Sequence, residues 1–143
     1  MNLNDLYQEI ILEHYKEPHN KGQLQAADAR SEGRNPMCGD EIQVSVKIKG
    51  DLIEDIRFEG SGCAISQASA SVMTKAVKGS TLEQAEKTLQ AFSSMIKDGG
   101  AFGEIDPESE LAAFQGVSEY PTRIKCALLA WNALKNSLDQ ITR

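Results

Sequence analysis

The chain of 143 residues is predicted to fold as an α+β domain, with helices packed on one face of a small three-stranded antiparallel sheet. Three observations predict this class. Alternating apolar residues indicate a hairpin in the first half, helical periodicity covers most of the rest, and the strands are not interleaved with helices. Length and composition fit one globular domain over residues 1–143, since 41% of residues are hydrophobic and 25% are charged.

The first half of the chain supplies one helix and the predicted sheet. Asn2 or Asn4 can cap a helix whose apolar residues fall at helical spacing, and Pro18 ends it. A turn at Gly50 joins two stretches in which apolar and polar residues alternate, which predicts an antiparallel hairpin. The segment before the hairpin allows a short edge strand. The stretches concerned are 23–34 for the edge strand, and 41–48 and 52–59 for the hairpin.

The second half is predicted to be helical. A first helix follows Cys63 and runs to about Lys78. Ser80 and Glu83 have the spacing of a capping box, in which two residues satisfy each other's backbone N–H groups, and the helix they open runs to about Lys97. The last two predicted helices are a short one from Asp106-Pro107 to Gly116 and a long one from Pro121 onward.

The bulk charge excludes one large class of function. The net charge is −6 and the pI is about 4.9, whereas a general nucleic-acid binder needs a basic surface for phosphate contacts. No apolar run has the length that spans a membrane, and the first residues lack the pattern of a signal peptide. We therefore expect a cytoplasmic protein, in which thiols stay reduced and the three cysteines form no disulfide framework.

The three cysteines share a placement at the boundaries of predicted elements. Cys38 lies in a turn before a strand, Cys63 at the start of a helix, and Cys126 near the start of the last helix. Core cysteines usually sit inside an element on its apolar face. Cys126 lies about 200° around the helix from Ile124, so it is expected to fall off the apolar stripe.

This placement allows reactive or metal-binding thiols as an alternative to structural cysteines, and spacing alone does not choose between them. The positive end of a helix lowers the pKa of a thiol, which we expect for Cys63 and also for Cys126, where Arg123 and Lys125 add positive charge. In the run N-P-M-C-G-D, the glycine allows a tight turn that directs Cys38 and the aspartate toward one point.

Three thiolates and the carboxylate of Asp40 make a four-ligand set. That number and these types suit tetrahedral zinc, and the thiolates equally suit an iron–sulfur cluster. The carboxylate is the harder donor, so it is expected to exchange most easily. A purely structural zinc site is a third interpretation of the same residues.

Three separate motifs resemble the IscU/SufU family of iron–sulfur cluster assembly proteins, which contains the NifU N-terminal-like domain. They are NPMCGDEIQV, IEDIRFEGSGCAISQASASVM and RIKCALLAWNAL, and the similarity extends over nearly the whole chain. The resemblance implies a small antiparallel sheet with helices. It also implies a metal site formed by Cys38, Asp40, Cys63 and Cys126.

Two differences from the cluster-scaffold branch resemble the SufU-type branch. Lys125 stands where scaffolds have a histidine, and 99–117 is extra chain before the last helix; Arg123 also fits this branch. The resemblance implies a zinc-dependent sulfurtransferase that accepts persulfide sulfur from a PLP-dependent cysteine desulfurase and passes it to downstream iron–sulfur assembly proteins. Cys38 is expected to be the acceptor, with Arg123 and Lys125 as auxiliary groups. The alternative is a scaffold on which Cys38, Cys63 and Cys126 hold a [2Fe–2S] cluster.

The remaining conspicuous residues are expected to serve structure. His14 is predicted on a helix surface, His19 in a loop and Trp131 in the core or at an interface. The small residues between Ser66 and Ser71 are expected to allow close helix packing rather than nucleophilic chemistry.

Overall fold

The computed structural model describes residues 3–142, and within them it confirms the α+β class. The predicted cap at Asn2 lies outside the described residues. No described helix combines the length and apolar character needed to cross a bilayer. The elements are α1 (Leu3–Lys16), β1 (Ala29–Asn35), β2 (Asp40–Lys49), β3 (Leu52–Ser61), α2 (Ala64–Val77), α3 (Leu82–Lys97), the 3-10 helix η1 (Glu110–Glu119) and α4 (Pro121–Ile141).

The sheet is antiparallel throughout, in the order β1-β2-β3. Both predicted hairpin strands are present, and the edge strand occupies the end of the segment that the sequence left ambiguous. The register pairs Asn35, the last residue of β1, with Asp40, the first residue of β2. The short turn between them therefore projects from one end of the sheet.

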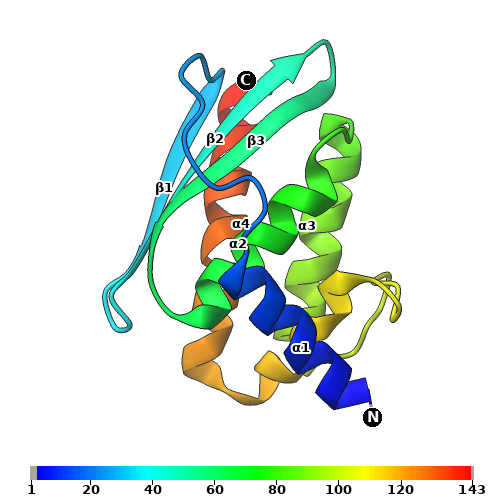
Figure 1. Ribbon diagram of the computed structural model, residues 1–143. Helices are drawn as coiled ribbons and strands as arrows, with labels where there is room; N and C mark the ends of the chain where they lie inside the picture. Colours follow the sequence, from blue (N-terminus) through cyan, green and yellow to red (C-terminus); the bar gives the residue numbers. More distant parts are fainter. Residues whose placement is uncertain (1–2, 143) are drawn as a thin grey trace.

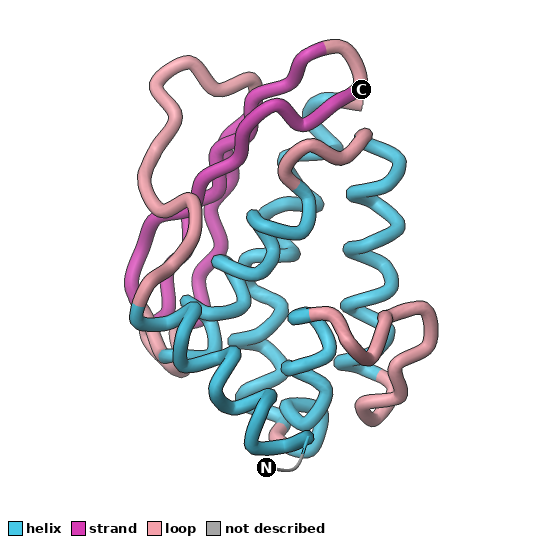
Figure 2. The backbone as a smooth tube through the Cα atoms, turned by 45° about the vertical axis from the view of Figure 1, so that its right-hand side comes forward, coloured by secondary structure: helices cyan, strands magenta, loops and turns pink. Residues whose placement is uncertain are grey.

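Helices cover one face of the sheet, as predicted (Figure 1). Helix α4 packs on β1 and β2, and α2 lies beside it against β3. The loop before β1 crosses the opposite face (Figure 2), where the N–H of Leu24 donates to Ser45 Oγ over 3.1 Å. Because side chains alternate along a strand, Val44 and Val46 reach the helical core while Ser45 is buried under this loop.

The core forms where α2, α3 and α4 meet. Trp131 is buried as predicted and stacks on Phe92, with ring centroids 4.4 Å apart. Its indole N–H donates to Ser69 Oγ over 3.0 Å, and that hydroxyl donates to the carbonyl of Ala127 over 2.6 Å. The small residues of α2 are buried, which lets neighbouring helices approach closely and confirms their predicted role.

Two predicted helix starts were wrong. Helix α3 is capped by Thr81 with Gln84, since the carbonyl of Ser80 is already paired with the N–H of Ile53 in β3. The short helix begins at Glu110 rather than at Asp106, because the Asp106 carboxylate accepts the N–H of Glu108 and closes a turn instead. It also continues beyond Gly116 to its end at Glu119.

Candidate metal centre

Three segments that are distant in sequence meet at one end of the molecule: the β1–β2 turn, the β3–α2 junction and the start of α4 (Figure 1). Each carries part of the predicted ligand set. Cys38 lies in the turn, Asp40 begins β2, Cys63 is the N-cap of α2, and Cys126 lies near the start of α4. The fold thus brings all four candidate residues together.

The distances bring three of the four candidate ligands into one small group, and Cys63 adjoins this group through Asp40. Ligand atoms of Cys38, Asp40 and Cys126 all lie within 4.8 Å of one another. The sulfurs of Cys126 and Cys38 are 3.5 Å apart, and Cys63 Sγ is 3.7 Å from Asp40 Oδ2. Sulfurs about 2.3 Å from a tetrahedral zinc ion are separated by roughly 3.8 Å. The donor set therefore suits zinc or an iron–sulfur cluster.

A tight turn presents Cys38. The carbonyl of Asn35 accepts the N–H of Cys38 over 3.2 Å, and Pro36 occupies the second position, where its fixed φ favours a turn. Gly39 has φ +71°, in the left-handed region that glycine tolerates best. This conformation reverses the chain so that Asp40 can enter β2.

Asp40 is held from the opposite side by the β3–α2 junction. It is 1% exposed, and its Oδ1 accepts the backbone N–H of Cys63 over 2.8 Å. This approach requires Gly62, which has φ +156°, because a Cβ at that position would overlap Asp40 Oδ1. The glycine before Cys63 therefore makes room for the Asp40 carboxylate.

Comparison with known proteins decides the family. Residues 6–138 match the NifU-like N-terminal domain. The zinc-dependent sulfurtransferase SufU of Bacillus subtilis is 44% identical, over 96% of this chain and 92% of that protein. The iron–sulfur cluster assembly scaffold protein IscU of Streptococcus pyogenes serotype M1 is 46% identical, over 96% of this chain and 86% of that protein. The crystal structure of FiSufU from Fervidobacterium islandicum AW-1 has a TM-score of 0.83 and 36% identity, over 94% of this chain and 98% of that one.

The chain belongs to the IscU/SufU family. It is accordingly an iron–sulfur cluster assembly protein with a metal-binding cysteine site. Identities of 44% and 46% to the SufU and IscU relatives do not separate the two branches.

The three cysteines of this IscU/SufU protein differ in exposure. Cys38 is exposed, Cys63 is half-buried and Cys126 is only 2% exposed. The expectation that Cys126 falls off the buried side of its helix was wrong. Helix α4 is covered by the sheet on one side and by α2, α3 and η1 on others, so it buries far more than one stripe.

The predicted lowering of the Cys126 pKa was also wrong. Burial raises the pKa of this thiol, and the neighbouring acidic groups of Asp40, Cys38 and Cys63 raise it further. A thiol that is buried beside acidic groups favours its neutral form unless positive charge is supplied nearby. The electrostatics of the cluster, like its distances, therefore suit a cation.

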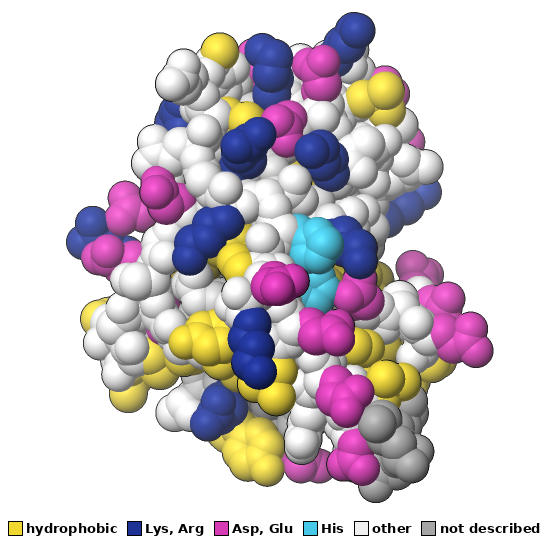
Figure 3. Space-filling view, viewed as in Figure 1, with side chains coloured by type: hydrophobic (Ala, Val, Ile, Leu, Met, Phe, Trp, Pro, Cys, Tyr) yellow, Lys and Arg dark blue, Asp and Glu magenta, His cyan; other side chains and the backbone are white. Residues whose placement is uncertain are grey.

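The two predicted auxiliary cations lie beside the cluster at the start of α4. Arg123 and Lys125 are both exposed, and within residues 3–142 neither side chain forms an ion pair. On the face seen in Figure 3, both basic and acidic side chains are present at the surface. Positive charge near the cysteines is therefore available to a charged group from outside the chain.

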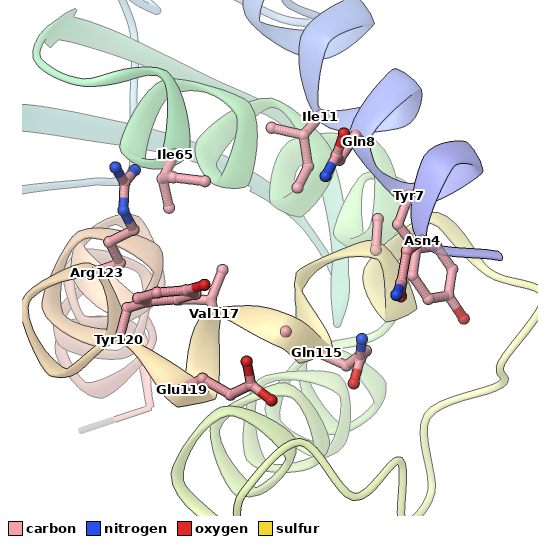
Figure 4. Close-up of a pocket in the computed structure, with 12 residues that line it drawn as sticks. Asn4, Tyr7, Gln8, Ile11, Ile65, Gln115, Val117, Glu119, Tyr120 and Arg123 are labelled. Atoms are coloured by element: carbon pink, nitrogen blue, oxygen red, sulfur yellow. The ribbon is translucent and has the colours of Figure 1, made fainter. Parts of the chain in front are cut away.

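A groove that the sequence did not predict opens next to this site (Figure 4). Tyr7 and Ile11 of α1 lie on one side of it, and Tyr120 and Arg123 on the other. Ile65, two residues after Cys63, lines the same end as Arg123. Its walls come from separate elements, so no local sequence pattern could have identified it.

The prediction for His14 was wrong, because its side chain belongs to a second polar cluster. We call it the His14 cluster; its members are His14, Ser71, Lys75 and Glu110. The His14 side chain is 3% exposed, because α1 packs that face on α2. Its Nδ1 is 2.7 Å from Ser71 Oγ and its Nε2 is 2.5 Å from Glu110 Oε2. Lys75 Nζ donates to the other Glu110 oxygen over 2.6 Å. His19 is exposed in a loop, as predicted.

Proposed function

We propose that this protein is a zinc-dependent sulfurtransferase that accepts persulfide sulfur from a PLP-dependent cysteine desulfurase and passes it to downstream iron–sulfur assembly proteins. The observation that carries the proposal is the unequal exposure of the cysteines: Cys38 is open to a partner, while Cys126 is buried in the same cluster. The similarity to the zinc-dependent sulfurtransferase SufU supports it. Lys125, in place of the scaffold histidine, supports it too.

The residues that would hold zinc are Cys38, Asp40, Cys63 and Cys126. When bound, zinc supplies the positive charge that keeps these thiols deprotonated near neutral pH. The chain itself orients the donors. The N–H of Cys63 fixes Asp40, and the turn closed by Asn35 fixes Cys38.

Sulfur transfer to Cys38 follows the chemistry of thiol–disulfide exchange. The Cys38 thiolate attacks the terminal sulfur of the desulfurase persulfide, and a new sulfur–sulfur bond forms on Cys38. The sulfur–sulfur bond of the donor breaks, and the donor cysteine leaves as a thiolate. The donor is reduced as Cys38 is oxidised, so the step needs no further oxidant or reductant. Arg123 and Lys125 stabilise the anionic persulfide that results.

The test is desulfurase turnover with a Cys38→Ser variant, with bound metal measured in the same sample. We expect turnover to fall to its level without this protein, and mass spectrometry to find one added sulfur on the wild-type Cys38 peptide only. Asn132→Asp, on the exposed side of α4, is the control and should behave as wild type. Full sulfur acceptance by the Cys38→Ser protein would contradict the assignment.

A scaffold function is the second candidate. The 46% identity to the S. pyogenes scaffold protein favours it, and three thiolates suit a [2Fe–2S] cluster. Anaerobic purification followed by iron, sulfide and zinc analysis separates the candidates. A stable stoichiometric cluster supports the scaffold, whereas tightly bound zinc together with strong stimulation of the desulfurase supports transfer. A purely structural zinc predicts unfolding on metal removal and a desulfurase indifferent to this protein.

A further inference from the structure

A buried amide that is not itself a candidate ligand contacts the cysteine cluster. Asn35 is the last residue of β1 and is 6% exposed. Its Nδ2 lies 3.7 Å from Cys126 Sγ, within hydrogen-bonding distance for a sulfur acceptor. An amide N–H is a donor and cannot coordinate a cation. The Nδ2 group of Asn35 therefore acts on the sulfur of Cys126 and not on a metal.

Asn35 also contacts a second cysteine of the cluster through its backbone. Its carbonyl accepts the N–H of Cys38 and closes the turn on which Cys38 is exposed. The two contacts are made by different groups of one residue. A substitution at position 35 removes the side-chain contact with Cys126 and leaves the carbonyl that holds Cys38.

The sulfurs of the two cysteines are consequently unequal. Cys126 Sγ receives an N–H donor in a buried setting, where a hydrogen bond to a charged acceptor is strong. Among the residues that the structure describes, Cys38 Sγ is bonded only to the sulfur of Cys126. A thiolate that accepts an N–H bond is stabilised as an anion and held in one orientation, as is known for groups that support metal ligands.

We propose that Asn35 is a positioning residue that makes Cys126 the retained ligand and leaves Cys38 as the ligand released for sulfur transfer. The inference rests on the proposed function and deepens it, because it names the feature that distinguishes the acceptor from its neighbour. The distinction lies in hydrogen bonding as well as in exposure.

The test uses Asn35→Asp, which has nearly the same shape but replaces the donor by an oxygen, and Asn35→Ala, which removes the donor without adding charge. The chain is loaded with Co²⁺, and the sulfur-to-metal charge-transfer bands and the rate of metal loss to a chelator are measured. We expect both variants to shift these bands and to lose metal about 10- to 100-fold faster than wild type. Asn132→Asp, exposed on α4, controls for the added charge.

A second readout follows the cysteines separately. The loaded protein is treated with iodoacetamide, and the modified peptides are quantified over time. In wild type we expect modification of Cys38 well before Cys126, and in both variants we expect this selectivity to fall at least tenfold. Circular dichroism shows which variants are folded. If Asn35→Asp does not fold, Asn35→Ala alone is compared with wild type.

Wild-type charge-transfer bands, metal loss and cysteine selectivity in the folded variants would overturn the role of Asn35. These readouts need no desulfurase. Failure of the sulfurtransferase function would appear instead as full sulfur acceptance by the Cys38→Ser protein, so the two failures are distinguishable.

Discussion

The cysteine cluster and the His14 cluster both gather buried polar groups from distant segments, yet they differ in charge balance. In the His14 cluster, both ring nitrogens and both Glu110 oxygens have partners within the chain, and Lys75 supplies a positive charge. In the cysteine cluster, three thiols and a carboxylate face one another. Within residues 3–142, the nitrogen donors to these four side chains are the backbone N–H of Cys63 and the side-chain amide of Asn35.

This difference separates a structural polar cluster from one built for a cation. Buried polar groups are stable when each finds a partner, and the His14 cluster meets that condition by itself. The cysteine cluster holds acidic groups at distances near those of a tetrahedral site, and burial among them raises the pKa of Cys126. A cation bound among these four side chains would supply the positive charge that none of them carries.

The largest effect is expected from a substitution that disrupts the cysteine cluster. Cys126→Ser replaces a soft, ionisable sulfur with a hydroxyl that stays protonated near neutral pH, so we expect bound metal to fall from one equivalent to almost none. Metal analysis of the purified proteins measures this. His14→Leu is the comparison and should retain its metal, since its cluster does not supply ligands. One equivalent of tightly bound metal in Cys126→Ser would contradict the assignment of this ligand.

The next largest effect is expected from a substitution that disrupts the His14 cluster. His14→Leu removes the ring nitrogens that contact Ser71 Oγ and Glu110 Oε2, and leaves Ser71 with the N–H of His19 and Glu110 with Lys75. We expect the free energy of unfolding to fall by about 1–3 kcal/mol. Urea denaturation of the metal-loaded proteins gives this value. His19→Leu, whose side chain is exposed, is the matched control and should change stability by less than about 0.5 kcal/mol. Equal losses in the two variants would argue against a structural role for the buried ring.

A smaller effect is expected from a substitution that changes the geometry of the metal centre. Gly62→Ala places a methyl group against Asp40, and we expect metal affinity to fall about tenfold, which corresponds to about 1.4 kcal/mol. Competition with a chelator measures the affinity. Gly79→Ala is the control for backbone strain, because Gly79 also has positive φ but an added Cβ meets nothing there. A loss of affinity in both variants would attribute the effect to general strain.

The smallest effect concerns pH. Hydrogen bonds from Lys75 and His14 hold the pKa of Glu110 below its ordinary value, although burial alone would raise it. A lowered carboxyl pKa contributes stability above the unfolded pKa of about 4.3, and this contribution is lost as the pH falls through the folded value. Urea denaturation at several pH values should therefore show a shallower acid loss in Glu110→Gln than in wild type. Glu108→Gln, with its exposed side chain, should follow wild type.

Local patterns in the sequence predicted much of the fold. The hairpin followed from period-two alternation, and the long last helix from apolar spacing after Pro121. Errors arose where a local signal competed with a distant partner. Ser80 is a residue type that often caps helices, but its carbonyl accepts the N–H of Ile53, and Thr81 caps the helix instead.

By itself the sequence determined which residues could form the metal centre, because residue type and motif identify Cys38, Asp40, Cys63 and Cys126 as a ligand set. Only the tertiary structure decided how these residues differ. Cys126 is buried because α4 is covered on several sides, and Asn35 reaches its sulfur across 91 positions of the chain. Burial and hydrogen bonding depend on the faces that distant elements present to one another, and spacing along the chain does not record them.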